Sequence, residues 1–309
     1  MKRSVFIDGA AGTTGLEIRE RLSGRLEIDL LVLDDDRRKD PTARRDALND
    51  ADFVVLCLPD DASRESVALI DNDRTRVIDA STAHRTADGW AYGFPELEPS
   101  QAGVIAAAPR VTNPGCYPTG FLALVRPLVR AGLIPADWAL TVNAVSGYSG
   151  GGRQMIEAYE RGEETSAFRG YALTLHHKHV PEMQRHARLE HPPIFTPAVV
   201  QTYRGMVVEV PLALYALPRR PSIDACRDVL AAAYESSAIV RVLDDGAALV
   251  RVEEDAGTDR LTLRVTGNAD RGQARLIATL DNLGKGAAGA AVQNLNVMAG
   301  FAPEAGLVL

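Results

Sequence analysis

The start of the chain holds the sequence feature that most restricts its fold. The apolar run at residues 4–7 leads directly into glycines at positions 9, 12 and 15, and a helical pattern begins at Leu16. A strand, a glycine-rich turn and a helix in this order are typical of a Rossmann-like domain, where backbone amides hold a dinucleotide pyrophosphate. The alternative is a plain strand-to-helix turn, which also uses glycine. The position of these glycines after the first strand of the chain favours the cofactor site. The predicted cofactor contacts are Gly9, Gly12, Thr13, Thr14 and Gly15.

The end of the second predicted strand, residues 28–33, bears on which cofactor is bound. In dinucleotide folds this position meets the adenosine ribose: an acidic residue favours a free 2′-hydroxyl, and arginine favours a 2′-phosphate. The chain offers Asp34 for the first and Arg37 and Arg38 for the second. We favour a 2′-phosphate on Arg37 or Arg38, and the other charges fit a solvated loop tip. The residues alone leave NADPH and NADH open.

Further short apolar runs at residues 53–58, 76–79 and 103–108 predict the remaining strands of a parallel sheet. Polar side chains that follow the carboxyl end of a parallel strand face the ligand crevice. After the run 76–79 we therefore predict that Ser81 contacts the cofactor and Arg85 the substrate. Helix capping would explain Ser81 equally well.

The charge balance excludes several kinds of partner. With 34 basic and 41 acidic residues the net charge is −7, so the chain has no overall attraction for nucleic acid or anionic membranes. No apolar run reaches transmembrane length and no signal-peptide pattern is present, which predicts a cytoplasmic protein. Three cysteines without metal-type spacing argue against disulfides and against a zinc site.

Cys116 is the candidate nucleophile. It lies in the run Asn113–Gly120, after the turn-forming Pro114 and Gly115 and before an apolar helical stretch. The first turn of a helix has unpaired N–H groups and a dipole that favours the thiolate, which is the attacking species. The alternative is that Cys116 is a small buried packing residue, which is the reading we give Cys57 and Cys226.

The second half of the chain predicts a different architecture. Apolar strands at 138–145, 204–214, 261–265 and 274–281 and a helix at 223–234 indicate an α+β domain with a mostly antiparallel sheet. The glycine- and serine-rich stretch from Ser146 and Gly147 is read either as a substrate contact or as a flexible loop. We predict a dinucleotide-binding domain at 1–115, rejoined by the C-terminal helix in 285–309, and a catalytic and oligomerisation domain at 116–284.

A histidine cluster supplies candidates for acid–base chemistry. In an extended segment His177 and His179 would share one face, and Glu182 could orient one imidazole. A metal is disfavoured because no third ligand lies nearby, and an exposed polar loop is the alternative. A dinucleotide loop, a helix-start cysteine and a distal histidine together point to thiol-dependent aldehyde chemistry, in which a thioester is reduced by hydride.

These motifs resemble those of N-acetyl-gamma-glutamyl-phosphate reductases, in the shorter-chain branch of that family. The similar segments are residues 9–15, 79–85, 92–97, 113–120, 144–147, 177–182 and 282–289. The resemblance implies an NADPH-dependent reductase of arginine biosynthesis that converts N-acetyl-L-glutamyl 5-phosphate into N-acetyl-L-glutamate 5-semialdehyde and phosphate. It implies a thioester on Cys116, His177 as acid/base, substrate contacts at His179 and Glu182, cofactor contacts at Asn282 and Lys285, and a homodimer or homotetramer.

Three alternatives stay open at this point. Another acyl-phosphate reductase, such as an aspartate-semialdehyde dehydrogenase, shares the chemistry. A non-catalytic NADP-binding regulator would need Cys116 only for packing. A hydrolase using cysteine and histidine would need no dinucleotide loop.

Overall fold

The computed structural model describes residues 2–34, 36–37 and 40–309, which divide into two compact units. Unit 1 comprises Met1–Pro95, Ser100–Gly115 and Ala287–Leu307, and unit 2 comprises Glu96–Pro99, Cys116–Gly286 and Val308–Leu309. One of the points where the chain passes between the units therefore falls between Gly115 and Cys116.

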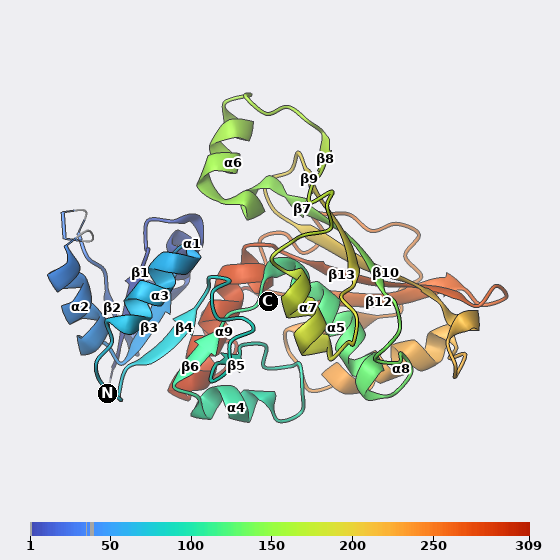
Figure 1. The fold of residues 1–309 in the computed structure, drawn as a ribbon, viewed down its shortest axis with the longest axis horizontal. Coiled ribbons are helices and arrows are strands. Elements are labelled where there is room, and N and C mark those ends of the chain that lie inside the picture. The colour runs from blue at the N-terminus through green and yellow to red at the C-terminus, as the bar shows by residue number, and fades with distance from the viewer. Residues whose placement is uncertain (1, 35, 38–39) are drawn as a thin grey trace. The chain divides into compact units, whose positions relative to one another are not determined.

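Unit 1 is built on a six-stranded parallel sheet with the order β2-β1-β3-β4-β6-β5 (Figure 1). Its strands are β1 (Arg3–Asp8), β2 (Ile28–Leu31), β3 (Phe53–Leu56), β4 (Arg76–Asp79), β5 (Ala91–Tyr92) and β6 (Arg110–Thr112). Its helices are α1 (Thr13–Leu22), α2 (Pro41–Asp50), α3 (Asp60–Ala68), α4 (Gln101–Ala107) and α9 (Gly289–Ala299). This is the predicted Rossmann-like arrangement, with helices on both faces of a parallel sheet.

Alternate residues of the strands build two separate cores. Val5 and Val55 pack with α1, α4 and α9 on one face, whereas Phe6 and Val54 pack with α2 and α3 on the other. Successive side chains of a strand point to opposite faces, so a sheet covered on both sides needs continuous apolar strands. The run Phe53–Leu56 meets that requirement because every residue in it is buried.

The predicted strand at 103–108 is wrong. Residues Gln101–Ala107 form helix α4, and the sheet positions beyond β4 are taken by β6 and β5. Within α4 only Ile105 is buried, which is the pattern of a surface helix with one contact to the core. Alanine is the best helix former, and a short apolar run cannot be assigned to helix or strand by periodicity alone.

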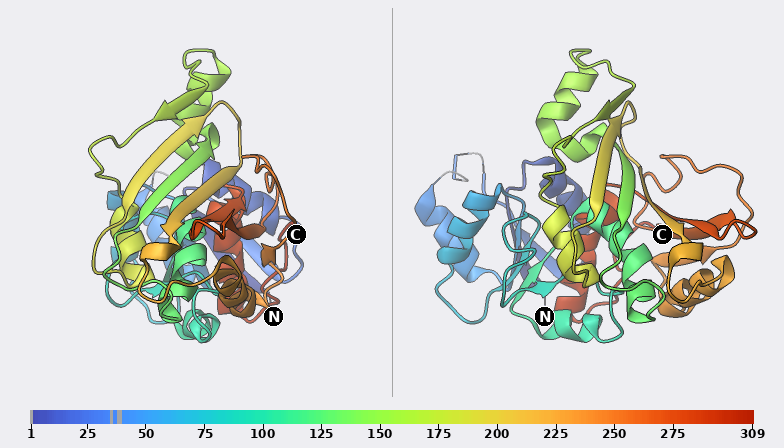
Figure 2. Two further views of the ribbon diagram at one scale, coloured as in Figure 1. Left: turned by 90° about the vertical axis from the view of Figure 1, so that its right-hand side faces the viewer. Right: turned by 45° about the vertical axis from the view of Figure 1, so that its right-hand side comes forward.

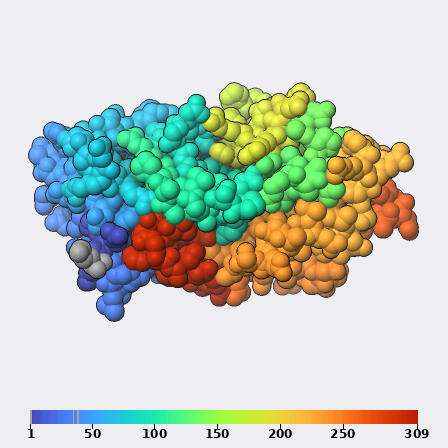
Figure 3. Space-filling view, turned by 90° about the horizontal axis from the view of Figure 1, so that it is seen from below, coloured from blue at the N-terminus to red at the C-terminus, as the bar shows by residue number. Residues whose placement is uncertain are grey.

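The C-terminal segment Ala287–Leu307 belongs to unit 1. Val292 and Leu295 of α9 join the same core as Val5. The guanidinium of Arg25 donates to Oδ1 of Asn296 at 2.7 Å and to the carbonyl of Ala305 at 3.0 Å. In the space-filling view the atoms of the C-terminal segment accordingly lie beside those of the N-terminal segment (Figure 3).

Unit 2 contains a seven-stranded sheet with the order β11-β12-β13-β10-β7-β9-β8. Its ribbon can be followed in Figure 2 by the colours from green to red. Its strands are β7 (Thr141–Gly147), β8 (Phe168–Gly170), β9 (Ile194–Val200), β10 (Met206–Ala213), β11 (Val240–Leu243), β12 (Leu261–Asn268) and β13 (Gln273–Leu280). Its helices are α5 (Cys116–Arg130), α6 (Gly152–Glu160), α7 (Val180–Ala187) and α8 (Ile223–Tyr234). The sheet is mixed: β11 with β12 and β7 with β9 are parallel, and the other neighbouring pairs are antiparallel.

Helix α5 is the buried helix of unit 2. Gly120 lets it approach β10 closely, since an added Cβ would lie 2.8 Å from the side chain of Val208. Pro127 lies inside the helix and has no N–H for the carbonyl of Ala123 four residues earlier. The hydroxyl of Tyr234 on α8 donates to that carbonyl at 2.9 Å. A distant side chain therefore satisfies the backbone group that the proline leaves without its helical partner.

Candidate active site

Cys116 is the first residue of α5 and is partly exposed. The other two thiols differ from it. Burial, together with the carboxylates of Asp79 and Asp8, raises the pKa of the Cys57 thiol to about 12. Burial raises the pKa of the Cys226 thiol to about 11. Both stay protonated at neutral pH, so the structure is consistent with packing roles for these two cysteines and leaves Cys116 as the candidate nucleophile.

The segment that leads to Cys116 is held tightly within unit 1. Asn113 donates from its backbone N–H to the carbonyl of Asp79 at 2.7 Å and from Nδ2 to the carbonyl of Ala287 at 2.9 Å. Its Oδ1 accepts from Nδ2 of Asn294 at 3.0 Å, and its carbonyl accepts from Nε of Arg85 at 3.0 Å. These bonds use every polar group of Asn113, so the backbone before the nucleophile has little freedom.

A close backbone approach lies beside Cys116 in unit 2. Residues Gly284–Ala288 form a π-helical turn, and an added Cβ on Gly286 would come within 2.9 Å of the Cys116 Cβ. Real Cβ atoms do not approach that closely, so position 286 requires glycine for this packing. Single π-helical turns are frequent at functional sites.

An aromatic cluster surrounds the residue that follows the nucleophile. Tyr117, Tyr171 and Phe195 pack with His177 and His179, with ring centroids between 4.7 and 6.4 Å apart. The Tyr117 hydroxyl donates to the carbonyl of Ala198 at 3.1 Å and accepts from the Tyr171 hydroxyl at 3.4 Å. The cluster joins residues from α5, β9 and the segment between β8 and α7. Both tyrosines are functional candidates that sequence reasoning missed.

Both tyrosine hydroxyls stay protonated near neutral pH. Burial raises the pKa of Tyr171 to about 12, and the nearby Cys116 contributes in the same direction. Burial also raises the pKa of Tyr117, with further contributions from Tyr171 and Cys116. Each hydroxyl therefore acts as a neutral hydrogen-bond donor.

His177 and His179 do meet, but the predicted extended segment is wrong. His179 is the N-cap residue of α7 and lies in a turn, with helical backbone angles. Its backbone N–H donates to Nδ1 of His177 at 3.1 Å. Because Nδ1 accepts this bond, the neutral imidazole carries its proton on Nε2. A backbone amide thus selects the tautomer, a role for which the sequence suggested Glu182, a buried residue in the first turn of α7.

Ser146 and Gly147 lie at the end of β7. The Ser146 hydroxyl is buried and donates to the carbonyl of Gly147 at 2.9 Å. An added Cβ on Gly147 would lie 2.8 Å from backbone atoms of Arg204, and the Gly147 N–H donates to the carbonyl of Gly205 at 2.9 Å. Packing within unit 2 therefore already requires glycine at position 147. A substrate contact at either residue stays a prediction.

Asn282 and Lys285 make specific contacts inside unit 2. Asn282 donates from Nδ2 to the Ser149 hydroxyl at 2.8 Å and accepts at Oδ1 from the Gly205 N–H at 2.9 Å. Lys285 is buried and forms an ion pair with Glu96 at 2.9 Å. These bonds hold the π-helical turn to neighbouring segments, and the predicted cofactor contacts of the two residues stay predictions.

A cavity of about 870 Å³ adjoins the glycine-rich turn of unit 1. Gly9 has a φ of +90°, and a Cβ there would overlap the carbonyl oxygen of Cys57. A Cβ on Gly15 would overlap the carbonyl oxygen of Gly9, so Gly15 allows α1 to pack against the turn. Gly12 is different: its φ is −78° and the nearest protein atom to an added Cβ lies 3.4 Å away. The protein itself does not require glycine at 12, as expected where a ligand approaches the backbone.

The charged groups of this cavity differ from those predicted. Arg19, Arg44, Asp8 and Asp34 line it. Arg44 pairs with Asp8 at 2.9 Å and donates to the Ser66 hydroxyl at 2.7 Å. Arg37 is exposed and lies outside the lining, as do Thr13 and Thr14, and Arg38 lies outside the described residues. Sequence reasoning missed Arg19 and Arg44 because both lie on helices away from the strand ends.

Ser81 and Arg85 follow β4 and are buried in unit 1. Ser81 donates from its N–H and its hydroxyl to the carboxylate of Asp79, at 2.9 and 2.8 Å, and Nδ1 of His84 lies 2.6 Å from the same carboxylate. Arg85 donates to the carbonyls of Asn113 and Ala80. Cofactor contact by Ser81 and substrate contact by Arg85 stay predictions.

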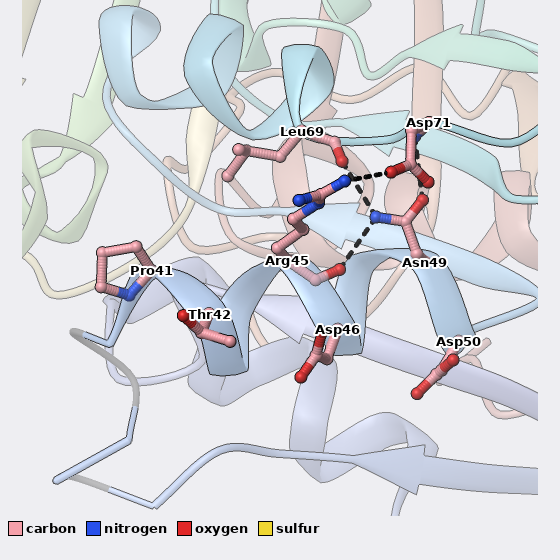
Figure 4. A pocket seen from close by; sticks show the side chains of 8 residues that line it. All are labelled: Pro41, Thr42, Arg45, Asp46, Asn49, Asp50, Leu69 and Asp71. Atoms are coloured by element: carbon pink, nitrogen blue, oxygen red, sulfur yellow. Dashed lines mark hydrogen bonds and ion pairs between the residues drawn. The ribbon is translucent and has the colours of Figure 1, made fainter.

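A second hollow lies on the surface of α2 (Figure 4). Arg45 pairs there with Asp71 at 2.6 Å, and Asn49 donates from Nδ2 to the carbonyls of Arg45 and Leu69 at 2.9 Å. These contacts tie α2 to the end of α3, which gives the hollow a structural explanation. Among the described residues, no group of His, Cys, Asp and Glu could hold a metal ion, and no helix is long and apolar enough to span a membrane.

Family comparisons match both units. A model described as the NAD binding domain of semialdehyde dehydrogenase matches residues 4–104, and its dimerisation domain matches residues 116–282. A structure of aspartate semialdehyde dehydrogenase II from Vibrio cholerae superimposes with a TM-score of 0.74 at 17% identity, covering 97% of this chain and 98% of that one. The fold and the cysteine-bearing unit therefore define a protein of the semialdehyde dehydrogenase class.

Curated relatives identify the family within this class to which the chain belongs. The N-acetyl-gamma-glutamyl-phosphate reductase of Chelativorans sp. is 52% identical, with 96% of this chain and 98% of the relative covered. That of Mesorhizobium japonicum is 51% identical, with 97% and 100% covered. The chain belongs to the N-acetyl-gamma-glutamyl-phosphate reductase family.

Proposed function

We propose that the protein is an oxidoreductase that uses NADPH to reduce N-acetyl-L-glutamyl 5-phosphate to N-acetyl-L-glutamate 5-semialdehyde, releasing phosphate, as a step of arginine biosynthesis. The observation that carries the proposal is Cys116 at the start of α5, next to the cluster of Tyr117, Tyr171 and His177. The family relatives and the glycine-lined cavity of unit 1 support the substrate and the cofactor.

Acyl transfer to Cys116 is the first step of this reaction. The Cys116 thiolate attacks the acyl carbon, a carbon–sulfur bond forms and the carbon–oxygen bond to phosphate breaks. Phosphate leaves with the bonding electron pair, and the enzyme holds a thioester. The start of α5 favours the thiolate through the helix dipole.

Reduction and release follow on the same residue. When bound, the nicotinamide supplies the hydride that reduces the thioester carbon. The resulting hemithioacetal oxyanion collapses to the aldehyde and regenerates the Cys116 thiolate, without a net proton. The geometry of His177, with its proton on Nε2, suits it to donate a hydrogen bond to that oxyanion. An acid/base role of His177 and substrate contacts by His179, Glu182, Ser146, Gly147 and Arg85 remain part of the proposal.

The cavity of unit 1 fits one end of a dinucleotide. Its volume of about 870 Å³ lies in the range of small-molecule sites, and Gly9 and Gly12 line it. We assign the pyrophosphate to the backbone of this turn and the start of α1, with Thr13 and Thr14 nearby. Arg37, Arg38, Ser81, Asn282 and Lys285 stay in the proposed cofactor site.

The two predicted domains have different proposed functions. We propose that residues 1–115 with 285–309 bind the cofactor, and that residues 116–284 carry catalysis and assembly into a homodimer or homotetramer. The matched dimerisation domain supports assembly, as do Phe168 and Ile194, two exposed apolar residues on β8 and β9. A monomer by light scattering at micromolar concentration would contradict it. Cys57, Cys116 and Cys226 form no disulfide, which fits a reducing cytoplasm.

A steady-state assay in the reverse direction tests the proposed reaction. N-acetyl-glutamate semialdehyde and aspartate semialdehyde would each be oxidised with NADP or NAD, with and without phosphate. We expect phosphate-dependent oxidation of the N-acetyl-glutamate semialdehyde with NADP. Preference for the aspartate compound would indicate an aspartate-semialdehyde dehydrogenase, and no turnover of either compound with intact NADPH binding would indicate a regulator.

A further inference from the structure

Part of the lining of the cavity beside the glycine-rich turn is apolar and exposed to solvent. Leu16 of α1 is 52% exposed and Val32, just after β2, is 37% exposed, and both line the cavity with Leu33 and Leu58. Exposed aliphatic side chains gathered in a cavity mark a ligand surface. A flat heteroaromatic base, such as adenine, matches this surface.

The charged groups that line the same cavity fall into two pairs of different kinds. Arg44 and Asp8 neutralise each other through their ion pair at 2.9 Å. Arg19 and Asp34 are both exposed, and neither side chain forms a hydrogen bond or an ion pair with another residue in the described part of the chain. Among the described residues that line the cavity, Arg19 is therefore an available cation and Asp34 an available anion.

Their places in the fold bring both groups toward an adenosine ribose. Asp34 follows β2, which pairs in parallel with β1, so it lies at the same sheet edge as the glycine-rich turn. Arg19 lies on α1, and side chains on a helix lean toward its N-terminus, which here is the glycine-rich turn. Arg37, the sequence candidate, is exposed but does not line the cavity.

We infer that Arg19 and Asp34 have opposite effects on the choice between NADPH and NADH. Arg19 binds the 2′-phosphate of NADPH, and Asp34 disfavours that phosphate. This inference rests on the proposed dinucleotide site and names the residues that choose between its two cofactors. The planar guanidinium of Arg19 forms charge-assisted hydrogen bonds with phosphate. The carboxylate of Asp34 repels the phosphate and accepts hydrogen bonds from a free 2′-hydroxyl.

The test uses adenosine fragments, which bind without any turnover. Adenosine 2′,5′-bisphosphate and adenosine 5′-monophosphate would be titrated calorimetrically into the wild-type protein, Arg19→Ala and Asp34→Asn. Arg21→Ala is the matched control, because Arg21 lies on the same helix but is paired with Glu17 at 2.6 Å.

Arg19→Ala should weaken binding of the bisphosphate by about 10- to 100-fold and leave the monophosphate within about twofold, since one charge-assisted contact is lost. Asp34→Asn should strengthen bisphosphate binding and weaken monophosphate binding, each by roughly 3- to 10-fold. Arg21→Ala should change neither. The Arg19 effect should shrink as salt is raised.

Unchanged bisphosphate binding in Arg19→Ala would overturn the inference, and so would loss of selectivity in Arg37→Ala instead. These outcomes leave the proposed reaction intact if the protein still binds NADPH and turns over. If the wild-type protein binds neither fragment nor NADPH, the result contradicts the proposed NADPH-dependent function and, with it, this inference.

Discussion

Nδ1 of His177 accepts a hydrogen bond from the backbone N–H of His179 at 3.1 Å. The bond places the proton of the neutral ring on Nε2, on the opposite side of the imidazole. The donor is a backbone amide at the start of α7. This tautomer fits the proposed role of His177 as a hydrogen-bond donor to a developing oxyanion.

The first prediction separates this donor role from proton transfer. His177→Ala should lower kcat by about 10²- to 10³-fold, the effect of removing one oxyanion donor. His177→Gln keeps an N–H donor and should retain at least about tenfold more activity than the alanine variant. His176→Gln, at an exposed neighbouring position, is the control and should match the wild type. Equal losses in the glutamine and alanine variants would favour an obligatory acid/base role.

The glycine-rich turn gives a second prediction, in which two similar substitutions behave differently. Gly9→Ala should destabilise the protein by about 1–3 kcal/mol, because alanine must adopt a φ of +90° and overlap the Cys57 carbonyl. Gly12→Ala should fold with near wild-type stability yet bind NADPH at least about tenfold more weakly. Chemical denaturation and a fluorescence titration measure the two effects. Tight NADPH binding by a stable Gly12→Ala protein would argue against the assigned pyrophosphate position.

The proline inside α5 gives a third prediction. Tyr234→Phe should cost about 1–3 kcal/mol of unfolding free energy, because the buried carbonyl of Ala123 loses its donor. Tyr215→Phe serves as the control, since Tyr215 is exposed. Urea denaturation at neutral pH compares the variants. A Tyr234→Phe protein as stable as the control would mean that the carbonyl has another donor.

The fourth prediction concerns acid stability. Hydrogen bonds from Arg264 lower the pKa of Asp245 from 3.8 to about 2. A carboxylate with a lowered pKa in the folded state stabilises the protein above its unfolded pKa, and this contribution disappears as pH falls through the folded value. The difference in unfolding free energy between the wild type and Asp245→Asn should therefore be independent of pH around pH 6. It should decline from about pH 4 toward pH 2. An advantage that grows as pH falls would contradict this assignment.

The local patterns of the chain were sufficient for much of unit 1. The Gly9–Gly15 turn and the strands with two apolar faces depend on neighbouring residues, so periodicity and turn chemistry predicted them. The same holds for the helix of unit 2 that begins at Cys116. The run 103–108 misled because a short alanine-rich segment fits a helix or a strand, and burial of Ile105 alone decided the outcome.

The errors at the site have a different cause. Tyr171 and Phe195 lie far from Tyr117 in the sequence, and only the pairing of β7, β8 and β9 brings them together with the histidines. The tautomer of His177 depends on a backbone turn rather than on residue type. Arg19 looks like any charged residue on a surface helix until the cavity beside it is known. Such relations are three-dimensional, and one sequence does not encode them as a readable pattern.

The covalent intermediate on Cys116 is the central claim, and mass spectrometry tests it most directly. The wild-type protein would be mixed with N-acetyl-glutamyl 5-phosphate in the absence of NADPH, quenched in acid, digested and analysed. We predict an N-acetyl-glutamyl adduct on the peptide that contains Cys116, and neither adduct nor turnover in a folded Cys116→Ser protein. Turnover in the serine variant, or an adduct on Cys57 or Cys226 instead, would contradict the account.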